Sequence, residues 1–199
     1  MTLVVATANP GKLRELEAVL ARTGIEVLGL SALADAAPVE ETGTTFLANA
    51  QAKAEGYSLR TEHPVLADDS GLEVDALEGR PGILSARFGG PHLSDAARCR
   101  AVLKGLIDVP EEQRTARFRC ALALARGGRT LSTYEGTVEG RILRELRGKG
   151  GFGYDPIFFL PGAGRTFAEL SPPEKEAVSH RGRALADLVR ALAEGTAGL

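Results

Sequence analysis

The chain has 199 residues, of which 44% are hydrophobic and 25% are charged, so it is long enough to bury a core. Its formal net charge of −2 excludes any global attraction to nucleic acid or to an anionic membrane. No apolar run could span a bilayer, and the N-terminus lacks the features of a signal peptide. Cys99 and Cys120 have no metal-type spacing. We therefore expect one domain over residues 1–199, with core thiols and a cytoplasmic location.

The first third of the chain predicts buried strands that lead into helices. Residues 3–6 are a short apolar run typical of a strand, and Asn9 and Pro10 suit the cap and first position of a helix that ends by Gly24. Further along, the pattern predicts a strand over 26–30, a loop over 31–43, a helix over about 45–59, and a strand over 64–67 that Asp68-Asp69-Ser70-Gly71 closes.

The remaining elements are read from alternation, turn residues and caps. In chain order we expect a long loop over 79–91, a helix over 94–107, a β-hairpin over 115–138 that turns at Gly127-Gly128, a glycine-rich loop over 148–155, a strand over 157–160, a short helix that Ser171 caps, and a last helix that His180 and Arg181 open and Gly195 stops.

Thr7-Ala8-Asn9-Pro10-Gly11-Lys12 stands between a strand and a helix, where free backbone N–H groups favour an anion. Lys12 falls in the first helical turn, where a cation is electrostatically misplaced unless a phosphate binds there. The alternative is a capped helix with a solvated lysine, and the local pattern leaves both readings open. Lysine occurs only at positions 12, 53, 104, 149 and 175, which makes each position informative.

Four carboxylates form a second candidate group: Glu40, Glu41, Asp68 and Asp69. The aspartates close a buried strand, a position where α/β proteins often place active-site groups. Their hard oxygen atoms suit Mg²⁺, and a carboxylate beside the metal can orient or deprotonate water. For the isolated Asp68-Asp69 pair, ordinary turn chemistry is the competing explanation.

Two further groups could recognise a base. The loop Gly150-Gly151-Phe152-Gly153-Tyr154-Asp155 lets backbone approach a ligand closely, Phe152 could stack on a base, and Asp155 could accept its N–H groups. A turn with two core aromatics is the alternative. Lys175, His180 and Arg181 follow, and Arg181 could donate to a purine O6 or to a phosphate. Together these groups favour a pocket for a magnesium nucleotide.

The chain resembles the inosine triphosphate pyrophosphatase family, the dITP/XTP pyrophosphatases, over nearly its full length. The resemblance is carried by six ordered segments: TANPGKLRE (7–15), EETGTTFLANAQAKA (40–54), ADDSGLEVDAL (67–77), GRPGILSARF (79–88), GFGYDPIF (151–158) and SHRGRAL (179–185). It implies an elongated, two-lobed α/β fold with a long central mixed sheet flanked by helices and an active-site cleft between the lobes. It also implies a homodimer.

The resemblance further implies Mg²⁺-dependent hydrolysis of purine nucleoside triphosphates such as ITP, dITP and XTP to monophosphate and pyrophosphate. Glu40 and Asp69 would bind Mg²⁺, and Asp69 would be the general base. The substrate would contact Thr7, Ala8, Asn9, Pro10, Gly11, Lys12, Lys53, Ser70, Phe152, Gly153, Tyr154, Asp155, Lys175, His180 and Arg181. The rival hypotheses are a Maf-type nucleotide pyrophosphatase that favours other bases and a nucleotide sensor that does not hydrolyse its ligand.

Overall fold

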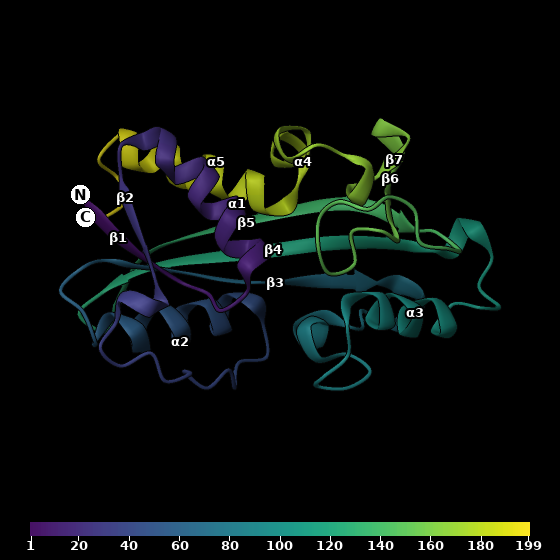
Figure 1. Ribbon diagram of the computed structural model, residues 1–199, viewed down its shortest axis with the longest axis horizontal. Coiled ribbons are helices and arrows are strands. Elements are labelled where there is room, and N and C mark those ends of the chain that lie inside the picture. Colours follow the sequence, from purple (N-terminus) through teal and green to yellow (C-terminus); the bar gives the residue numbers. More distant parts are fainter. The chain divides into compact units, whose positions relative to one another are not determined.

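The computed structural model describes all residues from 1 to 199, and they form an α/β structure built on a mixed sheet of seven strands in the order β2-β1-β3-β4-β5-β6-β7. The strands are β1 (Thr2–Ala6), β2 (Glu26–Gly29), β3 (Val65–Val74), β4 (Thr115–Arg126), β5 (Arg129–Ile142), β6 (Phe158–Leu160) and β7 (Arg165–Thr166). The helices are α1 (Pro10–Leu20), α2 (Phe46–Ser58), α3 (Asp95–Gly105), α4 (Pro172–Val178) and α5 (His180–Ala193) (Figure 1).

The chain forms two compact units. The first comprises 1–69, 120–136 and 181–199, and the second comprises 70–119 and 137–180. Each unit has its own apolar cluster, so each buries a separate part of the hydrophobic surface. None of the helices is long and apolar enough to cross a membrane.

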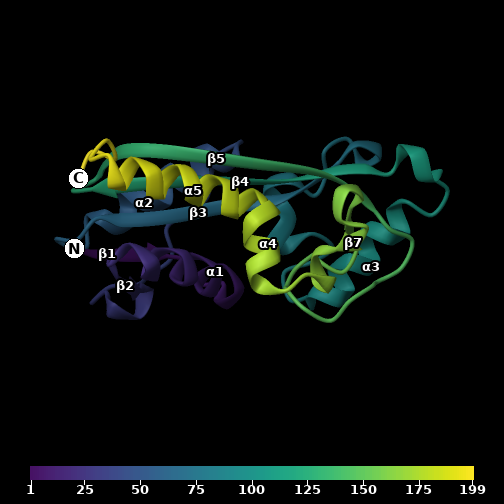
Figure 2. The ribbon, with the colours of Figure 1, turned by 90° about the horizontal axis from the view of Figure 1, so that it is seen from above.

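In the first unit, β1 pairs in parallel with β2 and with β3, and the β1–β3 pairing ends at Ala6 opposite Ala67. Helices α1 and α5 lie on one face of the sheet and α2 lies on the other (Figure 1). Seen from above, α5 runs along β4 and β5 (Figure 2). The core between them is aliphatic, and Leu16 of α1, Leu66 of β3 and Leu188 of α5 are fully buried in it.

In the second unit, α3 supplies Cys99 and Val102, and its C-cap residue supplies Leu106, to a cluster that also contains an aromatic group. Phe118, Phe158 and Phe167 form that group, with ring centroids 4.6 to 5.7 Å apart. Strand β6 pairs antiparallel with β5 and with β7. Buried aromatic pairs at this separation stabilise a core beyond the effect of their area alone.

Most of the predicted elements are confirmed within a few residues. Asn9 caps α1, Ser94 caps α3, and Ser171 with Glu174 forms a capping box at α4. The hairpin turns at Gly127-Gly128, where φ is +58° and +79°. Cys99 and Cys120 are both free and buried, as expected for core thiols.

The prediction that Asp68-Asp69 closes a strand is wrong. Strand β3 continues through Asp68, Asp69, Ser70 and Gly71 to Val74, because a neighbouring strand, β4, keeps it in the sheet where β1 has already ended. Asp, Ser and Gly are poor strand formers in isolation, so local propensity pointed to a turn and tertiary pairing overrode it. The expected loop over 79–91 also contains a short 3₁₀ helix, Gly82–Arg87.

Candidate active site

The segment between β1 and α1 is held by its own side chains. Thr7 Oγ1 accepts from the amide of Asn9 at 3.2 Å, and Asn9 Oδ1 accepts from the amides of Gly11 at 2.8 Å and Lys12 at 3.2 Å. Capping of this kind satisfies donors that a helix start otherwise leaves open. Because the cap already uses the amides of Gly11 and Lys12, these two donors are satisfied within the chain, and the ammonium group of Lys12 is the one positive charge that this turn can offer to an anion.

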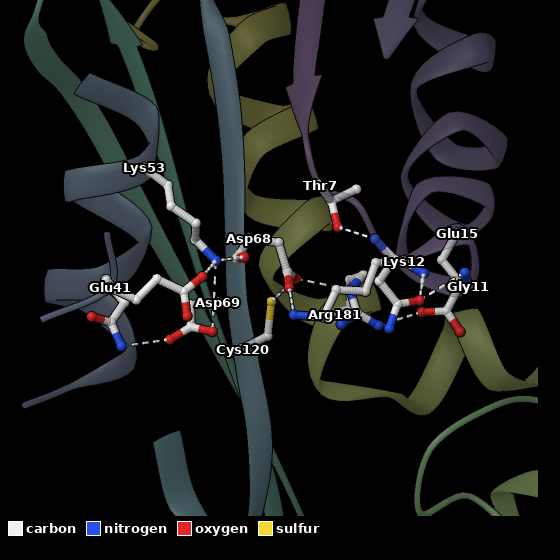
Figure 3. Close-up of polar contacts among 12 residues, drawn as sticks. Thr7, Gly11, Lys12, Glu15, Glu41, Lys53, Asp68, Asp69, Cys120 and Arg181 are labelled. Carbon is white, nitrogen blue, oxygen red and sulfur yellow. Dashed lines mark hydrogen bonds and ion pairs between the residues drawn. The ribbon is translucent and has the colours of Figure 1, made fainter. Parts of the chain in front are cut away.

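Asp68 is the centre of a buried ion cluster. Its Oδ1 pairs with Nζ of Lys12, and its Oδ2 accepts from Nε of Arg181 at 2.9 Å and lies 3.1 Å from Sγ of Cys120 (Figure 3). Burial by itself would raise the pKa of Asp68, but the charges of Arg181 and Lys12 outweigh it and hold the pKa well below its usual range. Asp68 is therefore an anion that fixes two cations.

Arg181 is anchored from a second side. Its Nη1 donates to Oε2 of Glu15 at 2.5 Å, and its side chain is only 2% exposed. Burial disfavours its charged form, yet the carboxylate of Asp68 reverses this effect and raises the pKa of Arg181. Glu15 and Asp68 together therefore fix a permanent cation where α5 meets α1.

Asp69 lies in a different environment from its neighbour. Its Oδ2 accepts from Nδ2 of Asn49 at 3.1 Å, and Nζ of Lys53 is 3.7 Å from its Oδ1. Burial raises the pKa of Asp69, and the charges of Lys53 and Lys12 oppose the shift without cancelling it. Asp69 is consequently a more basic carboxylate than Asp68, and its side chain is 10% exposed.

Lys53 joins the two aspartates. Its Nζ donates to the backbone oxygen of Asp68 at 2.7 Å and lies 3.0 Å from Oε1 of Glu41. Burial lowers the pKa of Lys53, but the charges of Asp69, Glu41 and Asp68 outweigh this and leave it raised. Lys53 is therefore a stable cation beside the Asp68-Asp69 step.

The alternation of a strand explains the division of the cluster. Successive side chains of β3 point to opposite faces, so Asp68 meets Lys12 and Arg181 on the side of α1 and α5. Asp69 faces α2, which supplies Asn49 and Lys53 one helical turn apart. Figure 3 shows β3 between the two groups. Both groups lie one or two residues beyond Ala67, where pairing with β1 has ended.

The carboxylates of this site suit a metal ion that is bound jointly by the protein and other ligands better than one bound by protein side chains alone. No group of three or more His, Cys, Asp or Glu side chains in residues 1–199 could hold a metal ion. Mg²⁺ normally takes one or two protein carboxylates and completes its shell with phosphate oxygens and water. The partly accessible carboxylate of Asp69 and the exposed Glu40 and Glu41 are of this type, so they fit a Mg²⁺ ion that takes its remaining ligands from outside the protein.

The glycine-rich loop lies in the second unit and is organised by Asp155. Oδ2 of Asp155 accepts from the amide of Phe152 at 2.9 Å and from Nζ of Lys175 at 2.5 Å. Nζ of Lys175 also lies 4.5 Å from the centroid of the Phe152 ring, a cation–π contact. A Cβ at Gly151 would meet Oδ2 of Asp155 at 2.0 Å, so glycine is required there.

The other predicted residues of this unit have structural partners. Tyr154 is buried, and its hydroxyl donates to the backbone oxygen of Ser85 at 2.7 Å. The ring of His180 stacks on Phe118 with centroids 4.7 Å apart. Ser70 lies within β3 directly after Asp69. Among the predicted residues of this unit, Phe152, Gly153 and Ser70 are partly exposed, and the others are buried.

Sequence reasoning missed four participants: Glu15, Glu41 as the partner of Lys53, Asn49 and Cys120. Asn49 had a detectable signal, since it is one of two asparagines in the chain and shares a helix face with Lys53. Glu15 and Cys120 had none, because their partners Arg181 and Asp68 are distant in the sequence. Buried Arg114 was also missed; its guanidinium donates only to backbone oxygens, among them that of Ile142 at 2.8 Å.

Fold and site together define a class: an α/β protein with lysines and carboxylates gathered at the carboxyl end of a parallel strand pair. The sequence model of the Ham1 family matches residues 3–191, and the chain belongs to that family. It is 53% identical over 186 residues to a dITP/XTP pyrophosphatase of Geobacillus kaustophilus (strain HTA426), which covers 94% of this chain and 91% of the relative.

Solved structures agree with this assignment. A HAM1 protein from Coxiella burnetii superposes with a TM-score of 0.87 at 42% identity, covering 98% of this chain and 99% of the other. A protein from Mycobacterium abscessus ATCC 19977 / DSM 44196, described as nucleoside-triphosphatase / dITP/XTP pyrophosphatase, superposes with a TM-score of 0.76 at 48% identity, covering 94% and 98%.

Proposed function

We propose that this chain hydrolyses the non-standard purine nucleoside triphosphates ITP, dITP and XTP to the monophosphate and pyrophosphate in a Mg²⁺-dependent reaction. The printed names of its relatives give the reaction class. The observation in the chain itself that carries the proposal is the meeting of Lys12 and Lys53 at Asp68 and Asp69. Paired lysines beside a basic carboxylate suit a polyphosphate and an attacking water.

Each group has a distinct role in this proposal. Lys12 and Lys53 neutralise the polyphosphate, with Thr7 to Gly11 shaping the turn beside it. Asp69, held by Asn49, orients the water and accepts its proton, for which its raised pKa suits it. Glu40 and Asp69 would hold Mg²⁺, which when bound offsets charge on the phosphate oxygens. Asp68 forms ion pairs with both Lys12 and Arg181, so its contribution is to position these cations.

Base selection is assigned to Phe152–Asp155, Lys175, His180 and Arg181, with Ser70 as a further substrate contact. A 6-keto purine offers an acceptor where adenine offers an amino group. A buried donor that adenine left without an acceptor would cost about 1–3 kcal/mol. The cation–π contact of Lys175 with Phe152 supports this role, because it places an ammonium donor of α4 beside the partly exposed Phe152 of the glycine-rich loop. Phe152 would stack on the base.

We further propose a single functional domain over residues 1–199, a homodimer and a cytoplasmic location, without nucleic acid or membrane partners. Free buried thiols at Cys99 and Cys120 support a reducing compartment. The net charge of −2 supports the absence of a nucleic acid partner. Sedimentation at micromolar protein tests the dimer, since a monomer has a mass of 20.9 kDa.

The test is pyrophosphate release from ITP, XTP, GTP, dTTP and UTP, each with Mg²⁺ and with a chelator. We expect ITP and XTP to be turned over best, only with Mg²⁺, and Asp69→Asn to lower turnover by about 10²–10⁴ while unfolding is unchanged. Preference for dTTP or UTP would favour a Maf-type activity. Tight binding of ITP without any turnover would favour a sensor.

A further inference from the structure

The loop that carries Phe152 has little intrinsic order. Gly151 and Gly153 flank the phenylalanine, and both have left-handed backbone, with φ of +71° and +61°. Glycine loses more conformational entropy than any other residue when it is fixed. Phe152 can therefore present its ring in one direction only if contacts outside this pair of glycines hold the peptide groups beside it.

One side of Phe152 is held by Asp155, which accepts from the Phe152 amide. The other side is held by two residues near the start of α3. Oδ2 of Asp95 accepts from the amide of Gly153 at 2.7 Å, and Sγ of Cys99 lies 3.3 Å from the Gly153 carbonyl oxygen. Asp95 and Cys99 are one helical turn apart, so one contacts the amide and the other the carbonyl group of Gly153. We call this pair of contacts the Gly153 clamp.

Both contacts are chemically well defined. Burial, reinforced by the charges of Asp95 and Asp155, raises the pKa of Cys99 to about 12, so the thiol keeps the proton that it donates. Asp95 is itself oriented, because its Oδ1 accepts from Nη1 of Arg98 at 3.1 Å. Its side chain is nevertheless 53% exposed, so it carries little of the packing of the unit.

We propose that Asp95, assisted by Cys99, is a positioning residue that fixes the Gly153 peptide and thereby the direction of the Phe152 ring toward the base. This inference rests on the proposed function, in which Phe152 stacks on the purine. Asp95 itself acts through Gly153 and need not touch the nucleotide. Loss of its acceptor should therefore weaken recognition of the base and leave the handling of the phosphates unchanged.

The first measurement needs no nucleotide. Hydrogen exchange of the Gly153 amide is followed by NMR in the wild type, Asp95→Ala, Asp95→Asn and Asp108→Ala, a control at an exposed aspartate after α3. We expect about 3- to 10-fold faster exchange in Asp95→Ala, the range for one lost hydrogen bond. Asp95→Asn keeps an acceptor but loses the charge at the helix start, so near-wild-type exchange there separates the clamp from the helix dipole.

The second measurement asks whether the clamp acts on base recognition. In Asp95→Ala we expect the KM for ITP and the inhibition constant of IMP to rise about 3- to 10-fold, with kcat within about twofold and inhibition by pyrophosphate unchanged. Asp95→Asn should restore both constants. A general loss of structure would weaken the binding of IMP and of pyrophosphate alike.

The outcomes separate the two proposals. If the wild type releases no IMP and pyrophosphate from ITP, the proposed function fails. Hydrogen exchange of the Gly153 amide still tests the Gly153 clamp in that case. Unchanged Gly153 exchange in Asp95→Ala overturns the clamp. If the wild type is active, two results in Asp95→Ala would overturn the assignment of Asp95 to base recognition. One is a lower kcat at an unchanged KM, and the other is a loss of pyrophosphate binding as large as the loss of IMP binding.

Discussion

At the scale of single residues, Asp68 and Asp69 show how position decides chemistry. They are adjacent and identical in type, yet the pKa of one is lowered and that of the other is raised. Burial acts in the same direction on both. The difference is that Asp68 directly contacts Lys12 and Arg181, whereas Asp69 accepts from the side-chain amide of Asn49 and has the ammonium group of Lys53 at 3.7 Å. The strand pleat, which sends them to different faces, is the underlying cause.

Asp68→Asn tests this account through stability. The substitution leaves Lys12 and Arg181 without their buried counter-charge, so the free energy of unfolding should fall by about 3–5 kcal/mol at neutral pH. The folded pKa lies below the unfolded value, so this stabilisation is complete above pH 3.8 and is lost as pH falls through the folded pKa. The difference in the free energy of unfolding between the wild type and Asp68→Asn should therefore become smaller below pH 3.8.

Urea unfolding without Mg²⁺ measures the free energy of unfolding of the wild type and of Asp68→Asn at each pH. Asp187→Asn, on the exposed side of α5, is the matched control. The control should stay within about 0.5 kcal/mol of the wild type at every pH. If the difference in the free energy of unfolding between the wild type and Asp68→Asn stayed constant from pH 7 to pH 2.5, the lowered pKa of Asp68 would be contradicted.

At the scale of elements, the helices place cations that their own geometry disfavours. Lys12 is in the first turn of α1, and Arg181 is the second residue of α5. A cation near a helix start is unfavourable by about 0.3–1 kcal/mol. Here Asp68 compensates both, which explains how the protein keeps them in place before any phosphate binds.

Lys12→Ala should weaken binding of ITP more than binding of IMP, because the ammonium group is assigned to the outer phosphates. Calorimetry is done in an Asp69→Asn background, because this substitution slows turnover during the titration. We expect the Kd of ITP to rise about tenfold or more, the range for a charged hydrogen bond, and that of IMP to change much less. Lys104→Ala, an exposed lysine of α3, is the control. Equal losses for ITP and IMP would remove Lys12 from the polyphosphate site.

At the scale of the whole molecule, the sequence predicted what depends on local pattern. Caps such as Asn9 and Ser171, the Gly127-Gly128 turn and the apolar runs identified most of the elements. The length of β3 escaped, because it depends on a neighbouring strand. The pairs Asp68–Arg181 and Glu15–Arg181 escaped as well, since they join residues 113 and 166 positions apart, and no short-range pattern records such contacts.

The central claim is that Lys12, Lys53 and Asp69 serve hydrolysis of a triphosphate that releases pyrophosphate. The most direct test is product analysis by ³¹P NMR after the wild type, with Mg²⁺, has consumed ITP. We predict inosine monophosphate and pyrophosphate in equal amounts. Accumulation of inosine diphosphate and orthophosphate instead would contradict the account.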